Sequence, residues 1–206
     1  MFDVGTLAYH LRRGGVALRS RFGIRVILIH LAIIALFGVW WPHMRGVEFF
    51  DPVFLSAYAC LGVVFAGPAA AQGLADRPKS MREALVKVGL AAFYGELMAI
   101  LILFAGFCTV ISAQKVSIGL DVIGLIWAGL LGLSGTIAVS AVAGWIAMRF
   151  SPNAARTAMR VIFLGLLCLF FFKSRWLPDV VGRGISVCTG IAILAIFAIN
   201  RAIPRD

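Results

Sequence analysis

Long apolar runs separated by short polar intervals dominate the sequence. Six runs reach or approach the roughly 20 residues that cross a bilayer as a helix. They are Ile24–Trp41, Pro52–Gln72, Leu85–Ser112, Ile118–Met148, Ala155–Phe172 and Ile185–Asn200. The runs are continuous and do not alternate between apolar and polar residues, as the strands of a membrane barrel would. The pattern therefore predicts an all-α polytopic membrane protein with six transmembrane helices, in one membrane domain over residues 24–206.

The residues before the first run predict an amphipathic helix over residues 1–23. Small or apolar residues recur there at helical spacing, and one histidine and four arginines occupy other positions. The apolar stripe comprises Val4, Leu7, Ala8, Leu11, Gly15, Leu18 and Phe22. This pattern suits an interfacial helix on the cytoplasmic leaflet, with a plain basic lead-in to the first span as the alternative.

Composition agrees with the pattern of runs. The chain is 62% hydrophobic and 14% charged, with a mean hydropathy of +1.00, whereas soluble domains carry about 25% charged residues. With both termini on one side of the membrane, 14 of the 19 Lys and Arg residues lie on that side and five on the other. Cytoplasmic loops carry this excess, so we expect cytoplasmic N- and C-termini. The net charge of +10 follows from the same asymmetry, and we expect no nucleic-acid partner.

The polar interval Gln72–Lys87 lies between two predicted spans and carries four basic and two acidic residues. Within it, Ser80-Met81-Arg82-Glu83 has the spacing of a capping box, in which a Ser hydroxyl accepts from the backbone N–H three residues on and a Glu reaches back. A helix is therefore predicted to begin at Ser80 and to continue into the next span. The interval is expected to be a short folded element at the water boundary.

The fourth predicted span carries a small-residue ridge, with one member every four residues. Its members are Gly124, Ala128, Gly132, Thr136, Ser140 and Gly144. A shorter ridge of Gly62, Ala66 and Ala70 occurs in the second span. Small residues let helices approach closely in membranes, so we expect these ridges to pack helices within a monomer or a dimer.

Glu96 lies about ten residues, or roughly 15 Å, into the third span. An acidic group at that depth is costly and indicates either a functional site or a structural polar contact made by the protonated acid. Candidate partners are His30 in the first span, Tyr58 in the second and Thr136 in the fourth. His30 alone is a weak indication of a haem or metal.

Enzymatic chemistry has little support in the sequence. There is no GxxxxGK[ST] motif for a P-loop, no paired-carboxylate or Ser/His/Asp set and no metal-ligand cluster. The four cysteines fall in or beside apolar runs and form no CxxC. We expect no enzyme activity, no cofactor and no metal. Ser151-Pro152 predicts the start of the fifth span, with Ser at the N-cap and Pro at the first helical position.

This layout resembles the permease subunit of type-2, exporter-kind ABC transporters. The resemblance covers the whole chain and rests on architecture: the basic helix Val4–Phe22, six spans, the interval Ala75–Ala84 and the small-residue span that runs into AMRFSPNAARTAMR. It implies a homodimer or heterodimer of permeases in a bacterial inner membrane, driven by a separate ATP-binding subunit. A short cytoplasmic coupling helix would match Ala75–Ala84, and re-entrant helices would match Phe172–Arg183. The residues expected to contact the ATPase are Asp76, Arg77, Lys79, Ser80, Arg82 and Glu83.

Two other hypotheses fit the same pattern. A structural or assembly subunit of a larger membrane complex would use the small-residue ridge equally well. The other is an intramembrane lipid-modifying enzyme built around Glu96.

Overall fold

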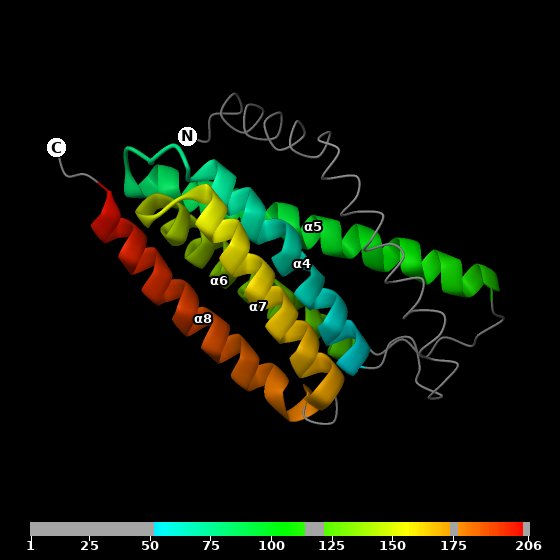
Figure 1. Ribbon diagram of the computed structural model, residues 1–206. Coiled ribbons are helices and arrows are strands. Elements are labelled where there is room, and N and C mark those ends of the chain that lie inside the picture. The colour runs from blue at the N-terminus through cyan, green and yellow to red at the C-terminus, as the bar shows by residue number, and fades with distance from the viewer. Residues whose placement is uncertain (1–51, 114–121, 174–176, 204–206) are drawn as a thin grey trace. The chain divides into compact units, whose positions relative to one another are not determined.

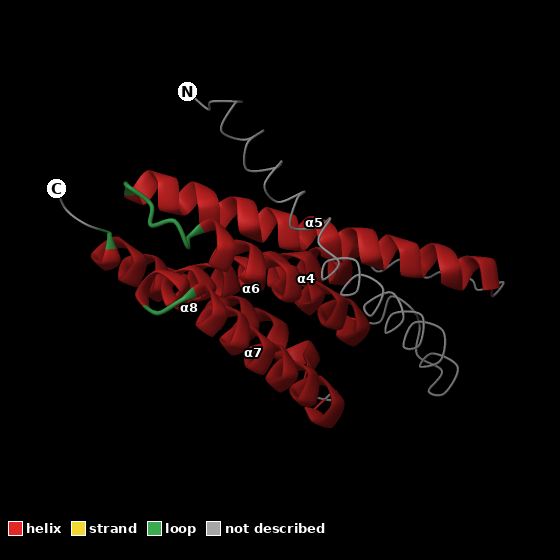
Figure 2. Cartoon of the chain, turned by 45° about the horizontal axis from the view of Figure 1, so that its top comes forward, coloured by secondary structure: helices red, strands yellow, loops and turns green. Residues whose placement is uncertain are grey.

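The computed structural model describes residues 52–113, 122–173 and 177–203 (Figure 1). All regular structure in these ranges is helical (Figure 2). The helices are α4 (Pro52–Gly73), α5 (Met81–Ala113), α6 (Val122–Arg149), α7 (Pro152–Lys173) and α8 (Leu177–Ala202). The predicted interfacial helix, the first span and His30 lie outside the described residues.

The five helices lie where the sequence predicts the second to sixth spans, so the all-helical class is confirmed. Three of them contain a stretch long and apolar enough to cross a membrane: Met81–Leu101, Gly129–Arg149 and Gly182–Ala202. The sequence predicts six spans, but within the described ranges only these three stretches are both long and apolar enough to cross a membrane. The chain therefore has the helices of a membrane protein, and three of them are candidate spans.

The chain divides into two compact units, and nearly all described side chains belong to the second one. Residues 1–47 and 104–116 form the first unit, and residues 48–103 and 117–206 form the second. Helix α5 crosses the boundary after Leu103.

Alternate helices in this unit run in the same direction. Gly62 of α4 lies beside Thr136 of α6, and Leu74 at the end of α4 lies beside Gly144. These two helices are therefore parallel. Helix α5, which connects them in the chain, runs in the opposite direction. The α4–α5 turn, the α6–α7 turn and the end of α8 consequently lie at the same end of the unit (Figure 1).

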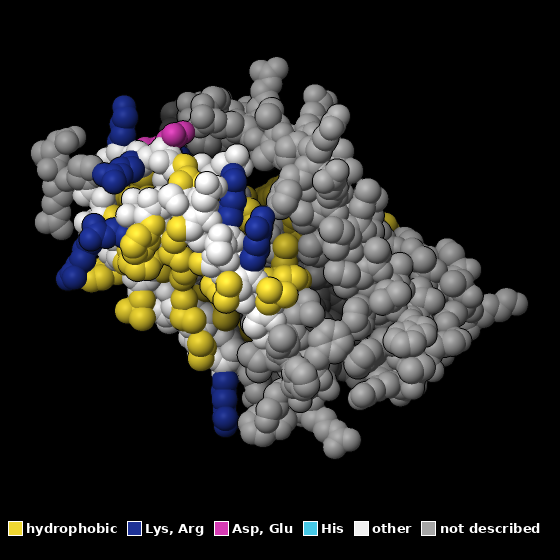
Figure 3. Space-filling model, viewed as in Figure 1, with side chains coloured by type: hydrophobic (Ala, Val, Ile, Leu, Met, Phe, Trp, Pro, Cys, Tyr) yellow, Lys and Arg dark blue, Asp and Glu magenta, His cyan; other side chains and the backbone are white. Residues whose placement is uncertain are grey.

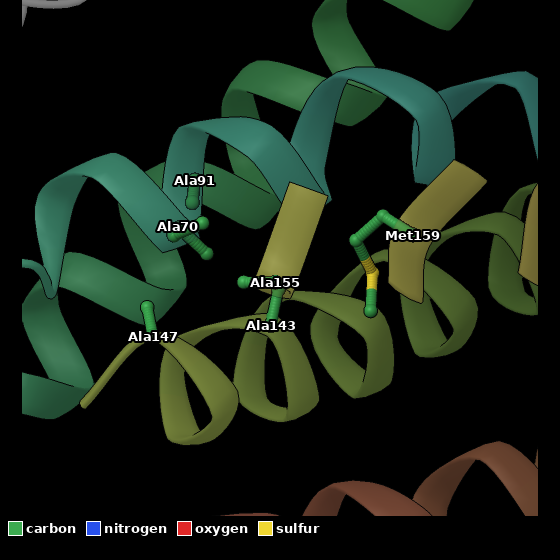
Figure 4. Packing of buried hydrophobic residues seen from close by; sticks show 7 residues of the cluster. Ala70, Ala91, Ala143, Ala147, Ala155 and Met159 are labelled. Carbon is green, nitrogen blue, oxygen red and sulfur yellow. The ribbon is translucent and has the colours of Figure 1, made fainter. Parts of the chain in front are cut away.

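Small residues hold the helices close together. Ala70 and Ala71 of α4 form one buried cluster with Ala91 of α5 and with residues of α6 and α7 (Figure 4). The α6 and α7 members are Ala143, Ala147, Ala155 and Met159. A second cluster joins α8 to the same end of the unit through Ala195 and Ile199. Because the core side chains are mostly methyl groups, the stability of the unit depends on close backbone approach and dispersion contacts.

Large apolar side chains point outward on the described helices. Phe93 is 61% exposed, Ile123 70% and Leu194 70%. Small residues thus face inward and large ones outward, the reverse of a water-soluble bundle. A hydrocarbon environment explains this arrangement, because lipid tails are as apolar as leucine.

Candidate functional site

The start of α5 is capped as the sequence predicts, with one difference. The Glu83 N–H donates to Ser80 Oγ at 3.2 Å, and the Ala84 N–H donates to the Ser80 carbonyl at 3.1 Å. The Glu83 carboxylate reaches back one residue further than expected and accepts from the Lys79 N–H at 2.9 Å. The capping box is therefore confirmed at Ser80, while Glu83 closes it on Lys79.

Lys87 connects this helix start to the preceding turn. Its Nζ lies 2.8 Å from Glu83 Oε1 and donates to the Asp76 carbonyl at 3.2 Å. The Lys87 side chain is only 8% exposed, although it carries a charge. A buried ammonium group is stable only when it is paired, and Glu83 and Asp76 supply the partners. Sequence reasoning counted Lys87 only as a loop charge, although its i,i+4 spacing from Glu83 could have indicated the pair.

The turn is anchored in the bundle and is not a helix of its own. Leu74 and Pro78 are fully buried, and the Leu74 N–H donates to the Ala70 carbonyl at 2.9 Å. Residues 74–80 form turns and bends, and α5 begins at Met81. The expected separate coupling helix over Ala75–Ala84 is therefore wrong. Pro78 disfavours helical geometry in the residue before it. The Ser80 cap then sets the start of α5 at the next residue, Met81.

Basic side chains gather at this end of the unit. Asp76, Arg77, Lys79, Ser80 and Arg82 are exposed on the turn. Arg149, Arg156, Arg160 and Arg201 are carried by the ends of the other helices that meet here. In Figure 3 most of the visible Lys and Arg side chains lie toward this end. The exposed tip is net positive, because its three basic side chains, Arg77, Lys79 and Arg82, outnumber the one exposed acid, Asp76, while Glu83 and Lys87 pair with each other.

The α6–α7 turn at the same end also agrees with the sequence. The Ala154 N–H donates to Ser151 Oγ at 3.1 Å, and α7 begins at Pro152. The predicted N-cap at Ser151 and helix start at Pro152 are confirmed. The re-entrant helices expected over Phe172–Arg183 are not seen where the structure describes that range, because α8 runs unbroken from Leu177 to Ala202. Residues 177–183 are its first two turns.

The ridge residues of α6 that the structure describes face into the bundle. Thr136 and Ser140 are completely buried, and a methyl group added at Gly144 would collide with the Leu74 side chain. The opposing α4 residues Ala66 and Ala70 are also completely buried. Gly132 is buried as well, whereas the surroundings of Gly124 and Ala128 lie outside the description.

Helix α5 carries a third small-residue face, which sequence reasoning missed. Its buried positions are Ala84, Val88, Ala91, Ala92, Gly95 and Ala99. These positions form two rows with one member every four residues, Ala84-Val88-Ala92 and Ala91-Gly95-Ala99. The second row has the spacing of Gly62-Ala66-Ala70 and could have indicated this face from the sequence. A methyl group added at Gly95 would lie 2.5 Å from the Gly62 carbonyl oxygen. The backbones of α4 and α5 are therefore in contact at this level.

Glu96 lies directly beside this contact. A methyl group added at Gly62 would meet Glu96 Oε2 at 3.2 Å and Thr136 Cγ2 at 2.6 Å. The sequence analysis named Thr136 as a candidate partner of Glu96, and both side chains approach the same point of α4, at Gly62. The Thr136 hydroxyl, however, donates to the Leu133 carbonyl at 2.9 Å, as hydroxyls in helices often do. Glu96 Oε2 is buried and has no hydrogen-bond partner in the described part of the chain. His30 and the side chain of Tyr58 are not described.

An apolar groove of about 190 Å³ lies along α5 and α6 next to Glu96. Its walls are almost entirely hydrocarbon: Gly89, Ala92, Phe93, Leu97, Ile100, Leu133 and Ile137, with Glu96 completing the lining. Phe93 and Ile100 are more than half exposed. The groove therefore opens on the surface that faces lipid.

No group of three or more His, Cys, Asp or Glu side chains that could hold a metal ion occurs among the described residues. No family model, curated protein or solved structure matches this chain.

Proposed function

We propose that this chain is the membrane subunit of an ATP-driven exporter, a permease with six spans and both termini in the cytoplasm of a bacterium. Two copies, or one copy and a related permease, would work with separate ATPase subunits in the inner membrane. The observation that carries the proposal is the fixed α4–α5 turn with its exposed basic tip. The ATPase docks on that tip.

A motor needs a stiff element to push against, and three independent contacts stiffen this turn. Leu74 and Pro78 anchor it in the core, Ser80 caps the helix that follows, and Lys87 joins the Asp76 carbonyl to Glu83. A loop that only satisfied the positive-inside rule would need charge but no defined geometry. A force applied at Arg77 or Arg82 is therefore transmitted to the adjoining ends of α4 and α5.

The charge of the turn indicates the chemistry of its partner. Three basic side chains, Arg77, Lys79 and Arg82, are exposed there against one acidic side chain, Asp76, whereas Glu83 is paired with Lys87. The partner surface is therefore acidic, because complementary charge speeds docking and excludes wrong partners. This surface does not require the separate coupling helix of the type-2 permeases, so the proposal rests on the turn itself.

The structural-subunit hypothesis loses one of its supports. It relied on the small-residue ridge of α6 as a surface for other subunits, but Thr136, Ser140 and Gly144 pack inside the chain against α4. The described part of the ridge is thus occupied within one protomer. The transporter hypothesis relies on the turn, which remains exposed.

The test is purification of the full chain in gentle detergent, followed by mass spectrometry of the proteins that accompany it. We expect a P-loop ATPase to be recovered with wild type and to be depleted with Lys87→Met, which removes the contacts of Lys87 with the Asp76 carbonyl and with Glu83. Arg183→Met is the matched control, because it also removes one cation but lies at the opposite end of α8 and is exposed. A stoichiometric set of other membrane subunits without an ATPase would refute the proposal and favour the structural subunit. Equal ATPase recovery with Lys87→Met and Arg183→Met would refute the role of the turn.

A further inference from the structure

The surroundings of Glu96 determine what this carboxyl group can bind. Its Oε2 is buried with no donor in the described part of the chain, and it points at the backbone of Gly62. The facing residues described on α4 and α6, from Gly62 to Gly73 and from Leu133 to Ser140, include no acidic, basic or histidine side chain. On α5 itself, the nearest ionisable groups are Tyr94 and, nine residues toward the turn, Lys87, which is already paired with Glu83.

A carboxylate in such a place needs a cation. A divalent metal ion takes six or more oxygen ligands, whereas the described surroundings offer one carboxyl group and one hydroxyl that is already committed to Leu133. The remaining neighbours are Gly62, Gly95, Ala66 and the hydrocarbon walls of the groove. A proton requires no coordination shell, and it removes the cost of burying the charge.

We propose that Glu96 is a proton-binding site within the membrane. Its carboxyl group holds a proton while α5 is packed against α4, and it releases the proton when the Gly62–Gly95 contact opens and the group reaches water. Binding and conformation are linked reciprocally, so the proton stabilises the packed arrangement and packing favours the proton. This inference does not depend on a partner ATPase.

The groove makes the proposal testable with a hydrophobic carbodiimide, because a reagent dissolved in the bilayer can approach Glu96 past Phe93 and Leu97. The protonated carboxyl adds across one N=C bond of dicyclohexylcarbodiimide: the acid proton goes to nitrogen and the carboxyl oxygen bonds to carbon. The O-acylisourea then rearranges to a stable N-acylurea, so the protein gains the mass of the whole reagent. Only the protonated acid supplies both the proton and the oxygen.

The full chain in lipid vesicles would be treated with the reagent between pH 6 and pH 10, and the adduct located by peptide mass spectrometry. We expect an adduct on Glu96 whose rate of formation falls about tenfold per pH unit above the midpoint of its titration. Glu83 on the same helix is the internal control and stays unmodified, because it is ionised by Lys87 at the water boundary. The Glu96→Gln protein should lose the adduct.

A second measurement covers poor access of the reagent. If Glu96 binds a proton on folding, the melting temperature of wild type falls as pH rises, relative to Glu96→Gln. Labelling of Glu96 at a rate independent of pH would overturn the proposal. Absence of an adduct in wild type, together with parallel pH profiles of melting for the two proteins, would also overturn it.

Discussion

The contact between Gly95 and the α4 backbone predicts opposite effects for two identical substitutions on one helix. In Gly95→Ala, the new methyl group would lie 2.5 Å from the Gly62 carbonyl oxygen, 2.6 Å from Ala66 Cβ and 3.0 Å from the Ala66 nitrogen. Two of these three neighbours are backbone atoms, so no side-chain rotation relieves the clash. In Gly89→Ala, the same methyl group would meet nothing within 4 Å.

The magnitudes follow from known costs of overpacking and helix propensity. Gly95→Ala should destabilise the protein by about 1–3 kcal/mol, the usual cost of forcing a methyl group into a packed interior. Gly89→Ala should stabilise it by about 0.4–1 kcal/mol, because alanine restricts the unfolded chain and fits a helix. The two variants should therefore differ by about 1.5–4 kcal/mol, or roughly 3–16 °C in melting temperature for a chain of this size.

Thermal unfolding of the purified variants in one detergent, followed by the loss of monodisperse protein on size-exclusion chromatography, measures this difference. Gly62→Ala should fall between the two, because its closest neighbour is the end of a side chain, Thr136 Cγ2. Equal melting temperatures for Gly95→Ala and Gly89→Ala would refute close contact between α4 and α5. A Gly95→Ala protein more stable than wild type would refute it as well.

Two further predictions concern the end of the unit that carries the α4–α5 turn. Ser80→Ala combined with Glu83→Ala keeps every Lys and Arg, so orientation should persist. It removes caps worth about 1 kcal/mol each and also the carboxylate partner of Lys87, so hydrogen exchange in the first turn of α5 should become faster. Unchanged exchange would show that these contacts do not order this helix start. In a chain without native cysteines, Ser80→Cys and Asn153→Cys should be protected from an impermeant thiol reagent in intact cells and Arg183→Cys should react, because the charge asymmetry orients the turn inward. Labelling of Ser80→Cys without permeabilisation would invert the topology and remove the docking argument.

Features set by local chemistry could be predicted from the sequence. The caps at Ser80 and Ser151 depend on a hydroxyl and the next few backbone N–H groups, so short motifs were sufficient to find them. Helix positions followed from the long apolar runs, although α8 begins at Leu177, eight residues before the predicted Ile185. Pro178 and Asp179 look like loop residues in the sequence, but proline is well tolerated in the first turn of a helix.

Features set by tertiary contact could not be predicted in the same way. Nothing local distinguishes Gly95, which contacts the α4 backbone, from Gly89, which has open space beside it. The burial of Lys87 depends on the turn placing the Asp76 carbonyl eleven residues earlier in the chain. Glu96 and Thr136 could be named as candidates, but their approach to Gly62 depends on helices that meet only in the folded bundle.

The two sites on α5 constrain how a force at the turn can act. Lys87 ties α5 to the turn, and Gly95 contacts α4 eight residues further on, about 12 Å along the helix. A partner that pushes the turn can move α4 and α5 as one hairpin against α6, which keeps Gly62 and Gly95 together and leaves Glu96 packed. Alternatively, the push can separate α5 from α4, which opens that contact and exposes the carboxyl group. Only the second motion would couple docking to release of the proton proposed to bind Glu96, because Glu96 lies beside the α4–α5 contact and not in the turn.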